Sequence, residues 1–332
     1  MRKRMLFCVT ALAFTLCGFH AQAKEGFSLH LAVEFTDHAA SAYIAQHMGW
    51  FEAEGITPTF YSYITGMSLA AALVRGDIQA AYMCLLPAIN ARANARVPIK
   101  IVAGTHKHGY GLAVNAEKVK TIKGLVRPDI RIGAVQTGSP ADAILLKTIE
   151  KYGLDRDTVL GKVQRMSPPM QIMAIRMGKL DASFSPEHWP AMAEEAGFDI
   201  LLSSQDVWPD MQGSVLLVKE ELIKNHPDIV GKLVAITGKA TTWIQQNPEE
   251  AASVMAAQLQ VAGDKIFPIE AAETTVKLAI SPEAVRRSMG RLEYTTHIDP
   301  KGVQEVIDFA VRQGYIRKAF NADDILDLRF CQ

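Results

Sequence analysis

The sequence predicts an α/β protein made of two similar α/β lobes and a helical C-terminal tail. Short β-rich runs alternate with helical runs between residues 29 and 103, and the same alternation returns between residues 132 and 202. Strands that alternate with helices favour a mainly parallel sheet covered on both faces. Beyond residue 219 only long helical runs follow.

The composition is that of an ordinary globular protein. Of 332 residues, 49% are hydrophobic, 21% charged and 8% aromatic, which excludes disordered and collagen-like chains. At roughly 100 to 200 residues per domain the length fits two domains, and no Gly/Ser-rich or charge-repeat linker separates them. We therefore expect the domains to be closely joined.

The first 23 residues have the pattern of a secretory signal peptide. Basic residues 2–4 precede an apolar run of 14 residues at 5–18, and Ala21-Gln22-Ala23 follows as a cleavage site. The run is shorter than the about 20 residues that span a bilayer. We expect cleavage near Ala23 and a soluble periplasmic protein; lipidation of Cys17 is the alternative, which the bulky Leu16 disfavours.

Charge and cysteine content exclude two classes of protein. Loss of the signal peptide removes three of the 35 basic residues and leaves 35 acidic ones, a net charge of about −3. No polybasic stripe remains, so we expect no nucleic-acid partner. Only Cys84 and Cys331 remain as cysteines, which excludes a disulfide framework and leaves a single bridge open.

The first α/β unit begins with an alternating strand and a helix that ends at Gly55. Thr, Phe and Tyr content marks the second strand, Gly76 ends the second helix, and Pro87 suits the first turn of the third, where its missing N–H costs nothing. The predicted strands are 29–35, 56–64, 78–83 and 99–103, and the helices are 41–54, 69–75 and 87–94.

The second unit repeats this order. Its strands are predicted at 132–135, 163–166, 180–185 and 200–202, and its helices at 140–152, 169–177 and 191–196. Residues 75–82 and 177–184 share a helix end, a glycine and a strand, 102 residues apart. Any helix-to-strand turn resembles this pair, but its place in two parallel series favours a repeated unit.

The tail begins with a strand at 215–219. Its helices are predicted at 227–246, 248–259, 268–278, 282–291 and 300–314, and we expect them to pack on one of the two lobes. The chain should cross between lobes near residues 113–115 and 212–215. The first lobe is then 24–113 with 214–332, and the second is 114–213.

Ligands of such sheets bind beyond the carboxyl ends of the strands. The loops there are 36–38, 65–68, 82–84, 105–108, 136–139, 167–169 and 185–189. In the strongest of them Gly138 admits a ligand, Ser139 can cap a helix and Pro140 suits its first turn, which favours an oxyanion. A plain capped helix is the alternative. Ser68 is the candidate cap of a second such helix, and two helix ends facing one cleft would clamp a small anion.

Residues 187–189 add an acidic and aromatic loop to this cleft. Trp189 offers an apolar wall and Glu187 can accept hydrogen bonds from an amine. Asp37 and Glu187 argue against a bare inorganic anion and favour a zwitterion or an anion that carries a donor. The alternative for Glu187 is a solvated loop carboxylate.

Other chemistry has little support. His38, His106, His108 and His188 lack a specific zinc-binding spacing, so no metal site is predicted. No G-x-S-x-G, phosphate loop or H-E-x-x-H pattern occurs, so we predict no catalytic residue and no cofactor.

Residues 42–55 resemble the first helix of bacterial solute-binding proteins for nitrate, sulfonate, taurine and bicarbonate, which are related to the thiamine-pyrimidine (NMT1-like) binders. Residues 98–104 and 178–182 also fit that family, and the resemblance spans about 29–246. It implies a monomeric periplasmic binding protein of type II whose two lobes close on a small-molecule ligand and present it to an ABC permease in the membrane.

The resemblance also implies where the ligand lies. The family positions correspond here to Thr36, Asp37, His38, Gly66, Met67, Ser68, Met83, Cys84, Thr137, Gly138, Ser139, Glu187, His188 and Trp189.

The expected ligand is an aliphatic sulfonate or a taurine-like zwitterion, although residues 136–140 depart from the Gly-Ser-Thr pattern of sulfonate receptors. A thiamine-pyrimidine precursor is the rival, with Trp189, Tyr43, Tyr61 and Tyr82 as stacking partners, and nitrate or bicarbonate also remain. A metal-delivery receptor, with three of the four histidines converging, and a secreted enzyme stay open as other classes.

Overall fold

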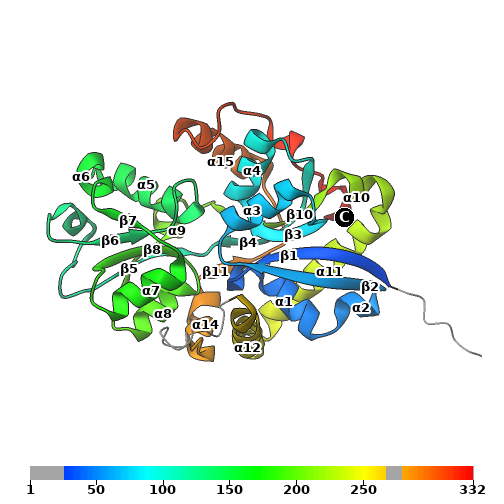
Figure 1. The fold of residues 1–332 in the computed structure, drawn as a ribbon, viewed down its shortest axis with the longest axis horizontal. Helices are drawn as coiled ribbons and strands as arrows, with labels where there is room; N and C mark the ends of the chain where they lie inside the picture. The colour runs from blue at the N-terminus through cyan, green and yellow to red at the C-terminus, as the bar shows by residue number, and fades with distance from the viewer. Residues whose placement is uncertain (1–25, 267–278, 332) are drawn as a thin grey trace, which may run out of the picture.

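The computed structural model describes residues 26–266 and 279–331. Two α/β lobes lie side by side along the long axis, each built on its own sheet (Figure 1). The prediction of two α/β lobes with a helical C-terminal region is confirmed. The predicted signal peptide and the predicted helix 268–278 lie outside the described residues.

The first lobe is built on a six-stranded sheet with the order β11-β4-β10-β3-β1-β2. The strand β1 is parallel to both of its neighbours, with Phe27 opposite Ile56 and Leu31 opposite Ala80. The elements up to the first crossing are β1 (Phe27–Glu34), η1 (Asp37–Ala39), α1 (Ala40–His47), α2 (Trp50–Ala53), β2 (Ile56–Tyr63), α3 (Gly66–Arg75), β3 (Ala80–Cys84), α4 (Leu85–Ala95) and β4 (Ile99–His108).

The second lobe is built on a five-stranded sheet with the order β7-β6-β8-β5-β9. Here β6 is parallel to β7 and β8, with Ile132 opposite Val163 and Ala182. Its elements are β5 (Tyr110–Val114), η2 (Ile122–Val126), β6 (Ile132–Ala134), α5 (Pro140–Tyr152), α6 (Arg156–Leu160), β7 (Val163–Arg165), α7 (Pro168–Arg176), β8 (Ala182–Pro186), α8 (Trp189–Glu195), β9 (Asp199–Ser203) and α9 (Ser204–Val207).

The expectation of mainly parallel sheets is wrong. Among the described strands, four pairings are parallel and five are antiparallel. The antiparallel pairings all involve β5, β10 or β11, whose partners lie far away in the sequence. Alternation along the chain predicts the parallel βαβ units but carries no information on such distant returns.

The chain passes from the first sheet to the second at Gly109, between β4 and β5. Gly109 has φ +83°, and a Cβ atom there would lie 2.7 Å from Nε2 of His38. A side chain is therefore excluded at this crossing on both conformational and steric grounds. The chain returns between β9 and β10, and the division into lobes near residues 113 and 213 stays a prediction.

The tail contacts both lobes, whereas the sequence predicts packing on one. Its elements are β10 (Gln212–Lys219), α10 (Glu220–Asn225), α11 (Pro227–Gln246), α12 (Pro248–Ile266), α14 (Pro282–Met289), β11 (Leu292–Tyr294), α15 (Pro300–Arg312), η3 (Ala322–Asp324) and η4 (Leu328–Cys331). The strand β11 is an unpredicted addition to the first sheet.

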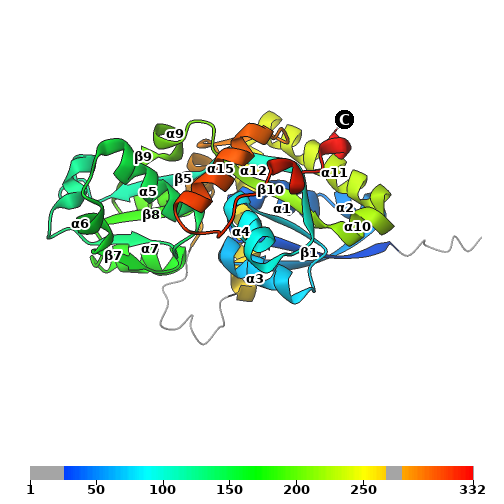
Figure 2. The same cartoon turned by 90° about the horizontal axis from the view of Figure 1, so that it is seen from above.

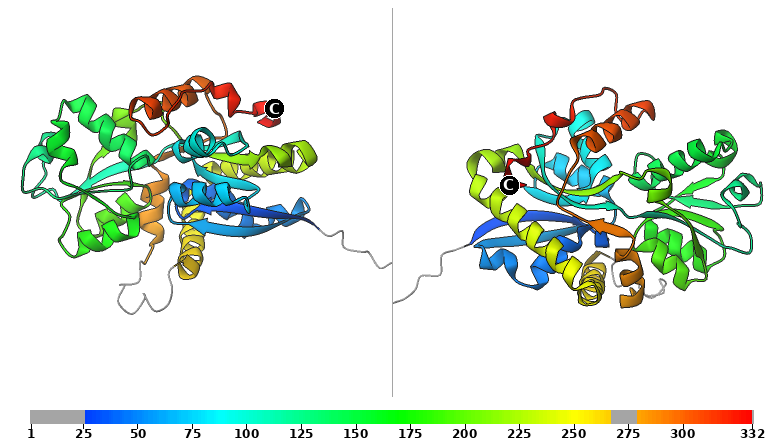
Figure 3. Two further views of the ribbon diagram at one scale, coloured as in Figure 1. Left: turned by 45° about the horizontal axis from the view of Figure 1, so that its top comes forward. Right: turned by 180° about the vertical axis from the view of Figure 1, so that it is seen from behind.

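Three contacts fix the tail in place. Helix α11 lies behind the first sheet (Figure 3, right), where Thr237 contacts the hydroxyl of Tyr82 at 2.8 Å. From α14, Arg287 donates to Glu194 of α8 at 3.2 Å. Helix α15 lies beside α4 and reaches toward the second lobe (Figure 2), where the Tyr315 hydroxyl donates to Asp142 of α5 at 2.5 Å.

Helix boundaries test the local predictions. Helix α5 begins and ends as predicted, because Ser139 caps it and Gly153 terminates it. The predicted first helix is interrupted before Gly49 and forms α1 and α2. The cap of α3 is Thr65, whereas Ser68 was expected there; Ser68 is the reciprocal member of the capping box.

The repeated segments end up as a repeated unit. Residues 75–82 lead through Gly76 into β3, and residues 177–184 lead through Gly178 into β8. Each strand is the parallel partner of a strand in its own sheet, β1 for β3 and β6 for β8. The repeated sequence pattern therefore correctly predicted two α/β units.

Replacing Asp181 with alanine should lower the free energy of unfolding by about 2 kcal/mol. The Asp181 side chain is 1% exposed and accepts hydrogen bonds from Lys118 Nζ at 2.7 Å and from Nε and Nη2 of Arg131 at 2.8 Å. Burial alone would raise the pKa of Asp181, but these hydrogen bonds outweigh it and hold the pKa well below its usual range. The stabilisation is therefore present at neutral pH and is lost on acidification below about pH 4.

Urea unfolding at pH 7 measures this loss. The control is Asp129→Ala, because the Asp129–Arg127 pair has side chains that are 57% and 51% exposed and should contribute less than about 0.5 kcal/mol. Equal losses in the two variants would contradict the role assigned to Asp181.

Candidate functional site

A cavity lies between the two lobes at the carboxyl ends of β1 and β3. Its volume is about 20 Å³, close to the space that one water molecule requires. We call it the interlobe cavity. It is lined by Glu34, Thr36, Ile64, Thr65, Gly66, Met67, Cys84, Pro87, Tyr110, Val135, Ser139, Pro140, Ala141, Pro168 and Pro186. These lining residues include one carboxylate and no lysine or arginine.

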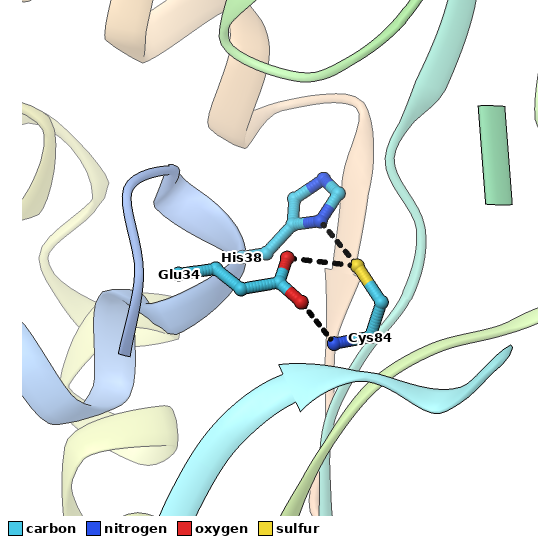
Figure 4. Close-up of side chains that lie close together, drawn as sticks. All are labelled: Glu34, His38 and Cys84. Carbon is cyan, nitrogen blue, oxygen red and sulfur yellow. Dashed lines mark hydrogen bonds between the residues drawn. The ribbon is translucent and has the colours of Figure 1, made fainter. Parts of the chain in front are cut away.

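Three side chains of the first lobe meet beside this cavity (Figure 4). The backbone N–H of Cys84 donates to Oε1 of Glu34 at 2.7 Å, and the thiol donates to Oε2 at 2.9 Å. Nδ1 of His38 lies 3.8 Å from the same sulfur. The three residues come from the end of β1, from η1 and from the end of β3, so the parallel order of these strands brings them together.

The His38 ring has a defined hydrogen-bonding state. Its Nε2 lies 2.8 Å from the carbonyl oxygen of Gly109, which can only accept, so Nε2 carries the proton and Nδ1 has the free lone pair. Burial lowers the pKa of His38 to about 3 and raises that of Glu34 to about 7, and Cys84 has its pKa raised well above the usual value, also by burial. His38 and Cys84 are therefore neutral at pH 7, whereas Glu34, with a pKa of about 7, is ionised in part of the molecules.

Groups from both lobes surround the sulfur. The Tyr110 hydroxyl, at the start of β5, donates to it at 3.0 Å, and Ser214 of β10 lies 3.6 Å away. The His106 ring lies 4.3 Å from the His38 ring, and Nε2 of His106 is buried without a hydrogen-bond partner among the described residues. Since Tyr110 belongs to the second sheet, the contact with Cys84 joins the lobes.

A second group of buried polar side chains lies where the loop after β1 meets the loop after β8. The Phe35 ring lies 6.1 Å from the His188 ring and 5.9 Å from that of Trp189. Six side-chain atoms here are buried and have no hydrogen-bond partner in the described structure: Asp37 Oδ1, Ser41 Oγ, Glu187 Oε2, His188 Nδ1 and Nε2, and Trp189 Nε1. We call this group the unpaired polar cluster.

Buried polar atoms without partners are rare, and each one costs roughly 1 to 3 kcal/mol. Burial raises the pKa of Glu187 to about 8 and that of Asp37 to about 7, although Arg291 lowers both. Arg291 Nη1 lies 3.4 Å from Glu187 Oε1 and its other terminal nitrogen donates to Glu194. The free oxygens of Asp37 and Glu187 are thus available to a donor that the chain itself does not supply.

Two of the amides at the start of α5 that were expected to hold an anion are already paired within the chain. The N–H of Gly138 donates to Asp142 Oδ2 at 3.0 Å, and the N–H of Ser139 donates to the Gln136 carbonyl at 3.1 Å. Asp142 also lies 2.5 Å from Arg165 Nη1. A carboxylate of the chain itself therefore occupies the position that the sequence assigns to a bound anion.

The predicted site residues fall into three groups. Those lining the interlobe cavity are Thr36, Gly66, Met67, Cys84 and Ser139. Those buried beside it or in the unpaired polar cluster are Asp37, His38, Glu187, His188 and Trp189. Those outside both sets are Met83, Gly138, Ser68 and Thr137; the first two are buried and the last two exposed.

Four important residues were not predicted. The predicted set lacks Glu34, Tyr110, Asp142 and Arg291. Of these, only Glu34 could have been singled out from the sequence, because it is the one acidic residue of β1. The metal-delivery alternative, which requires three of the four histidines to converge, is not supported in that form. The described residues that could hold a metal together are Glu34, His38 and Cys84, with one of the four histidines among them.

None of the helices in the described part of the chain is both long and apolar enough to cross a lipid bilayer.

Comparison with known structures identifies the fold. The alkanesulfonate-binding protein SsuA from Xanthomonas axonopodis pv. citri, bound to MOPS, has a TM-score of 0.74 at 17% identity, over 92% of this chain and 99% of that chain. The ligand-binding component of an ABC-type import system from Staphylococcus aureus, with zinc bound, also has a TM-score of 0.74 at 17% identity, over 92% and 97%. Both comparisons confirm the periplasmic-binding-protein fold.

Sequence comparison identifies the family. A protein of Brucella abortus (strain 2308), named only provisionally as a binding protein, is 26% identical over 136 residues, which are 38% of this chain and 40% of that protein. The chain thus matches about two fifths of the length of its curated relatives. The model of the NMT1-like family matches residues 22–260, well over half of the chain. The chain therefore belongs to the NMT1-like family.

Proposed function

We propose that the protein is the periplasmic solute-binding component of an ABC import system, which closes its two lobes on a small ligand and delivers it to a membrane permease. Its family, the binding functions named for SsuA and for the Staphylococcus aureus protein, and the leader pattern in residues 1–23 support this role. Closure of the two lobes on a ligand would bring residues of both lobes around one cavity. The residues around the interlobe cavity have this arrangement.

The unpaired polar cluster carries the proposal for the ligand class. Its free carboxylate oxygens, on Asp37 and Glu187, favour a ligand with an amino or ammonium group. Within the expected ligands this favours a taurine-like zwitterion over a plain alkanesulfonate, nitrate or bicarbonate, because the residues that line the interlobe cavity include no lysine or arginine.

The stacking arrangement expected for a pyrimidine has less support. The Tyr82 hydroxyl contacts Thr237, and that of Tyr43 contacts Ser62 at 3.2 Å. Neither of these tyrosines lines the interlobe cavity, and nor does Trp189, which is fully buried; the aromatic residue that does is Tyr110. A pyrimidine with an amino group stays as the second candidate, bound by Glu187 and Asp37.

Thermal unfolding of refolded, ligand-stripped protein tests this role. The panel contains taurine, ethanesulfonate, nitrate, bicarbonate and an aminopyrimidine thiamine precursor. A ligand at 100 times its Kd stabilises by about 2.7 kcal/mol, so a bound panel member should raise Tm by several degrees.

We expect taurine or the aminopyrimidine to raise Tm and ethanesulfonate, which lacks the amino group, to have no effect. An equal shift with ethanesulfonate would contradict the role of the carboxylates. A cooperative transition that no panel member moves would contradict the proposed ligand class.

A further inference from the structure

We propose that Glu34, His38 and Cys84 form a binding site for one zinc-like divalent ion, with a remaining coordination position open to the interlobe cavity. This inference goes beyond the receptor function and is independent of it. It depends on three donor atoms of different chemistry that lie within 4.8 Å of one another in a buried cluster.

The spacing of these donors suits a tetrahedral ion. Zinc binds sulfur at about 2.3 Å and imidazole nitrogen at about 2.0 to 2.1 Å, so the two ligand atoms of one ion lie about 3.6 Å apart. The sulfur of Cys84 and Nδ1 of His38 are 3.8 Å apart. Glu34 Oε2, at 2.9 Å from the sulfur, must withdraw by a fraction of an ångström when the S–H proton between them is replaced by an ion.

The imidazole is held in the form that a metal requires. Nε2 of His38 donates to the Gly109 carbonyl, so the lone pair of Nδ1 points into the cluster. A second hydrogen bond of this kind is characteristic of metal-binding histidines, because it fixes both the tautomer and the orientation of the ring. The missing Cβ at Gly109 allows the two groups to approach.

The carboxylate is oriented in the same way. Oε1 of Glu34 accepts from the backbone N–H of Cys84, which leaves Oε2 for the ion. The hydroxyl of Tyr110 donates to the sulfur from the second lobe at 3.0 Å. Two of the three ligands therefore have hydrogen bonds that position them and that do not use the donor atom facing the ion.

The charges balance only with a divalent cation. Binding releases one proton from the Cys84 thiol and one from Glu34 where that group is protonated, and both protons go to solvent. A thiolate, a carboxylate and a neutral imidazole then neutralise two positive charges, which lowers the cost of burying each of them. Thiolate and imidazole donors select zinc over magnesium or calcium.

An ion at this position would change what the cleft can bind. Glu34 and Cys84 both line the interlobe cavity, so the open position of the ion is reached from it. The ion would supply the positive centre that the lining residues lack, and an anionic group of a solute could complete its coordination.

Metal titration of chelator-stripped protein tests the site. We expect Zn²⁺ to bind with one-to-one stoichiometry in calorimetry with a competing chelator, and Co²⁺ to give the near-ultraviolet absorption of a thiolate complex. Loss of a hydrogen-bond partner of a metal ligand lowers metal affinity 10- to 100-fold. Cys84→Ser removes the thiolate ligand itself, so it should weaken Zn²⁺ binding by more than about 100-fold and abolish the thiolate band. The matched control is Cys331→Ser, which removes an exposed free thiol and should change neither.

Three outcomes would overturn the site: no thiolate band with Co²⁺ in the unaltered protein, a band that persists in Cys84→Ser, or Zn²⁺ affinity unchanged in both Cys84→Ser and Glu34→Gln. The Co²⁺ spectrum of the unaltered protein requires no variant. The test therefore remains valid if Cys84→Ser or Glu34→Gln fails to fold. Repeating the solute panel with and without Zn²⁺ separates the two proposals. If a solute raises Tm but the protein binds no metal, only the metal-site proposal is contradicted. If the protein binds metal but no solute raises Tm, only the solute-receptor proposal is contradicted.

Discussion

Replacing Glu187 with alanine should weaken the binding of taurine, or of whichever amino-bearing solute raises Tm, by about 100-fold or more. Oε2 of Glu187 is buried and has no partner in the described structure. Burial raises the pKa of Glu187 to about 8, and an ammonium group beside it lowers that pKa again, so the bound solute gains a hydrogen bond to an ionised carboxylate that no other described contact replaces. Truncating one member of a buried charged pair costs about 2 to 5 kcal/mol in binding. Calorimetric titration of the ligand-stripped variant measures this loss.

Glu194→Ala is the matched control for Glu187→Ala. Both carboxylates contact Arg291, Glu194 at 2.6 Å and Glu187 at 3.4 Å. Glu194 lies on α8 with a side chain that is 24% exposed and is absent from both the interlobe cavity and the unpaired polar cluster. Its removal should lower stability and change solute affinity by less than about threefold. Equal affinity losses in the two variants would mean that Glu187 acts only through Arg291.

Glu187→Gln separates charge from hydrogen bonding. Glutamine keeps an oxygen acceptor of similar shape but carries no negative charge. A ligand with an ammonium group should bind this variant nearly as weakly as Glu187→Ala, whereas a neutral aminopyrimidine should recover most of its affinity. The comparison therefore distinguishes the two ligand classes.

The predictions that depend on local chemistry are confirmed. Ser139, Pro140 and Gly153 determine where α5 begins and ends, and each of them acts on backbone groups within one turn. The repeated helix end at Gly76 and Gly178 identified two units for the same reason. Family membership and the two-lobe fold, inferred from residues 42–55, 98–104 and 178–182, are also confirmed.

The predictions that failed depend on pairings between distant residues. Nothing near β10 shows that it lies between β3 and β4, so the mixed sheet could not be predicted. The amides of Gly138 and Ser139 follow the pattern of an anion site, but no local rule states that Asp142 and Gln136 will satisfy them first. Apart from Ser41, the residues of the unpaired polar cluster do lie in the predicted loops 36–38 and 185–189, because the loops that follow the carboxyl ends of strands meet in both sheets near the cleft.

Asp142→Ala should lower the free energy of unfolding by about 3 to 4 kcal/mol, more than Asp181→Ala. Its carboxylate is 1% exposed and holds three groups: the N–H of Gly138, the hydroxyl of Tyr315 and the guanidinium of Arg165. It also places a negative charge at the N-terminus of α5, where the helix dipole favours it. Alanine leaves the Gly138 N–H and the Tyr315 hydroxyl without this acceptor and removes the ion pair of Arg165, which keeps its hydrogen bond to the Val135 carbonyl. Tyr315 can then no longer connect the tail to Asp142 in the second lobe. Urea unfolding measures the loss, and Tyr315→Phe, which removes one hydroxyl, should cost only about 1 kcal/mol.

The same variant decides between two views of the start of α5. If these amides held the anionic end of the solute, removal of the competing carboxylate would strengthen solute binding several-fold. If Asp142 is a permanent part of the helix start, as its contacts with Gly138, Tyr315 and Arg165 indicate, solute affinity measured well below Tm should stay within about threefold of the original. A large gain in affinity for ethanesulfonate, which has no amino group, would restore the anion site to α5 and move the solute away from Glu187.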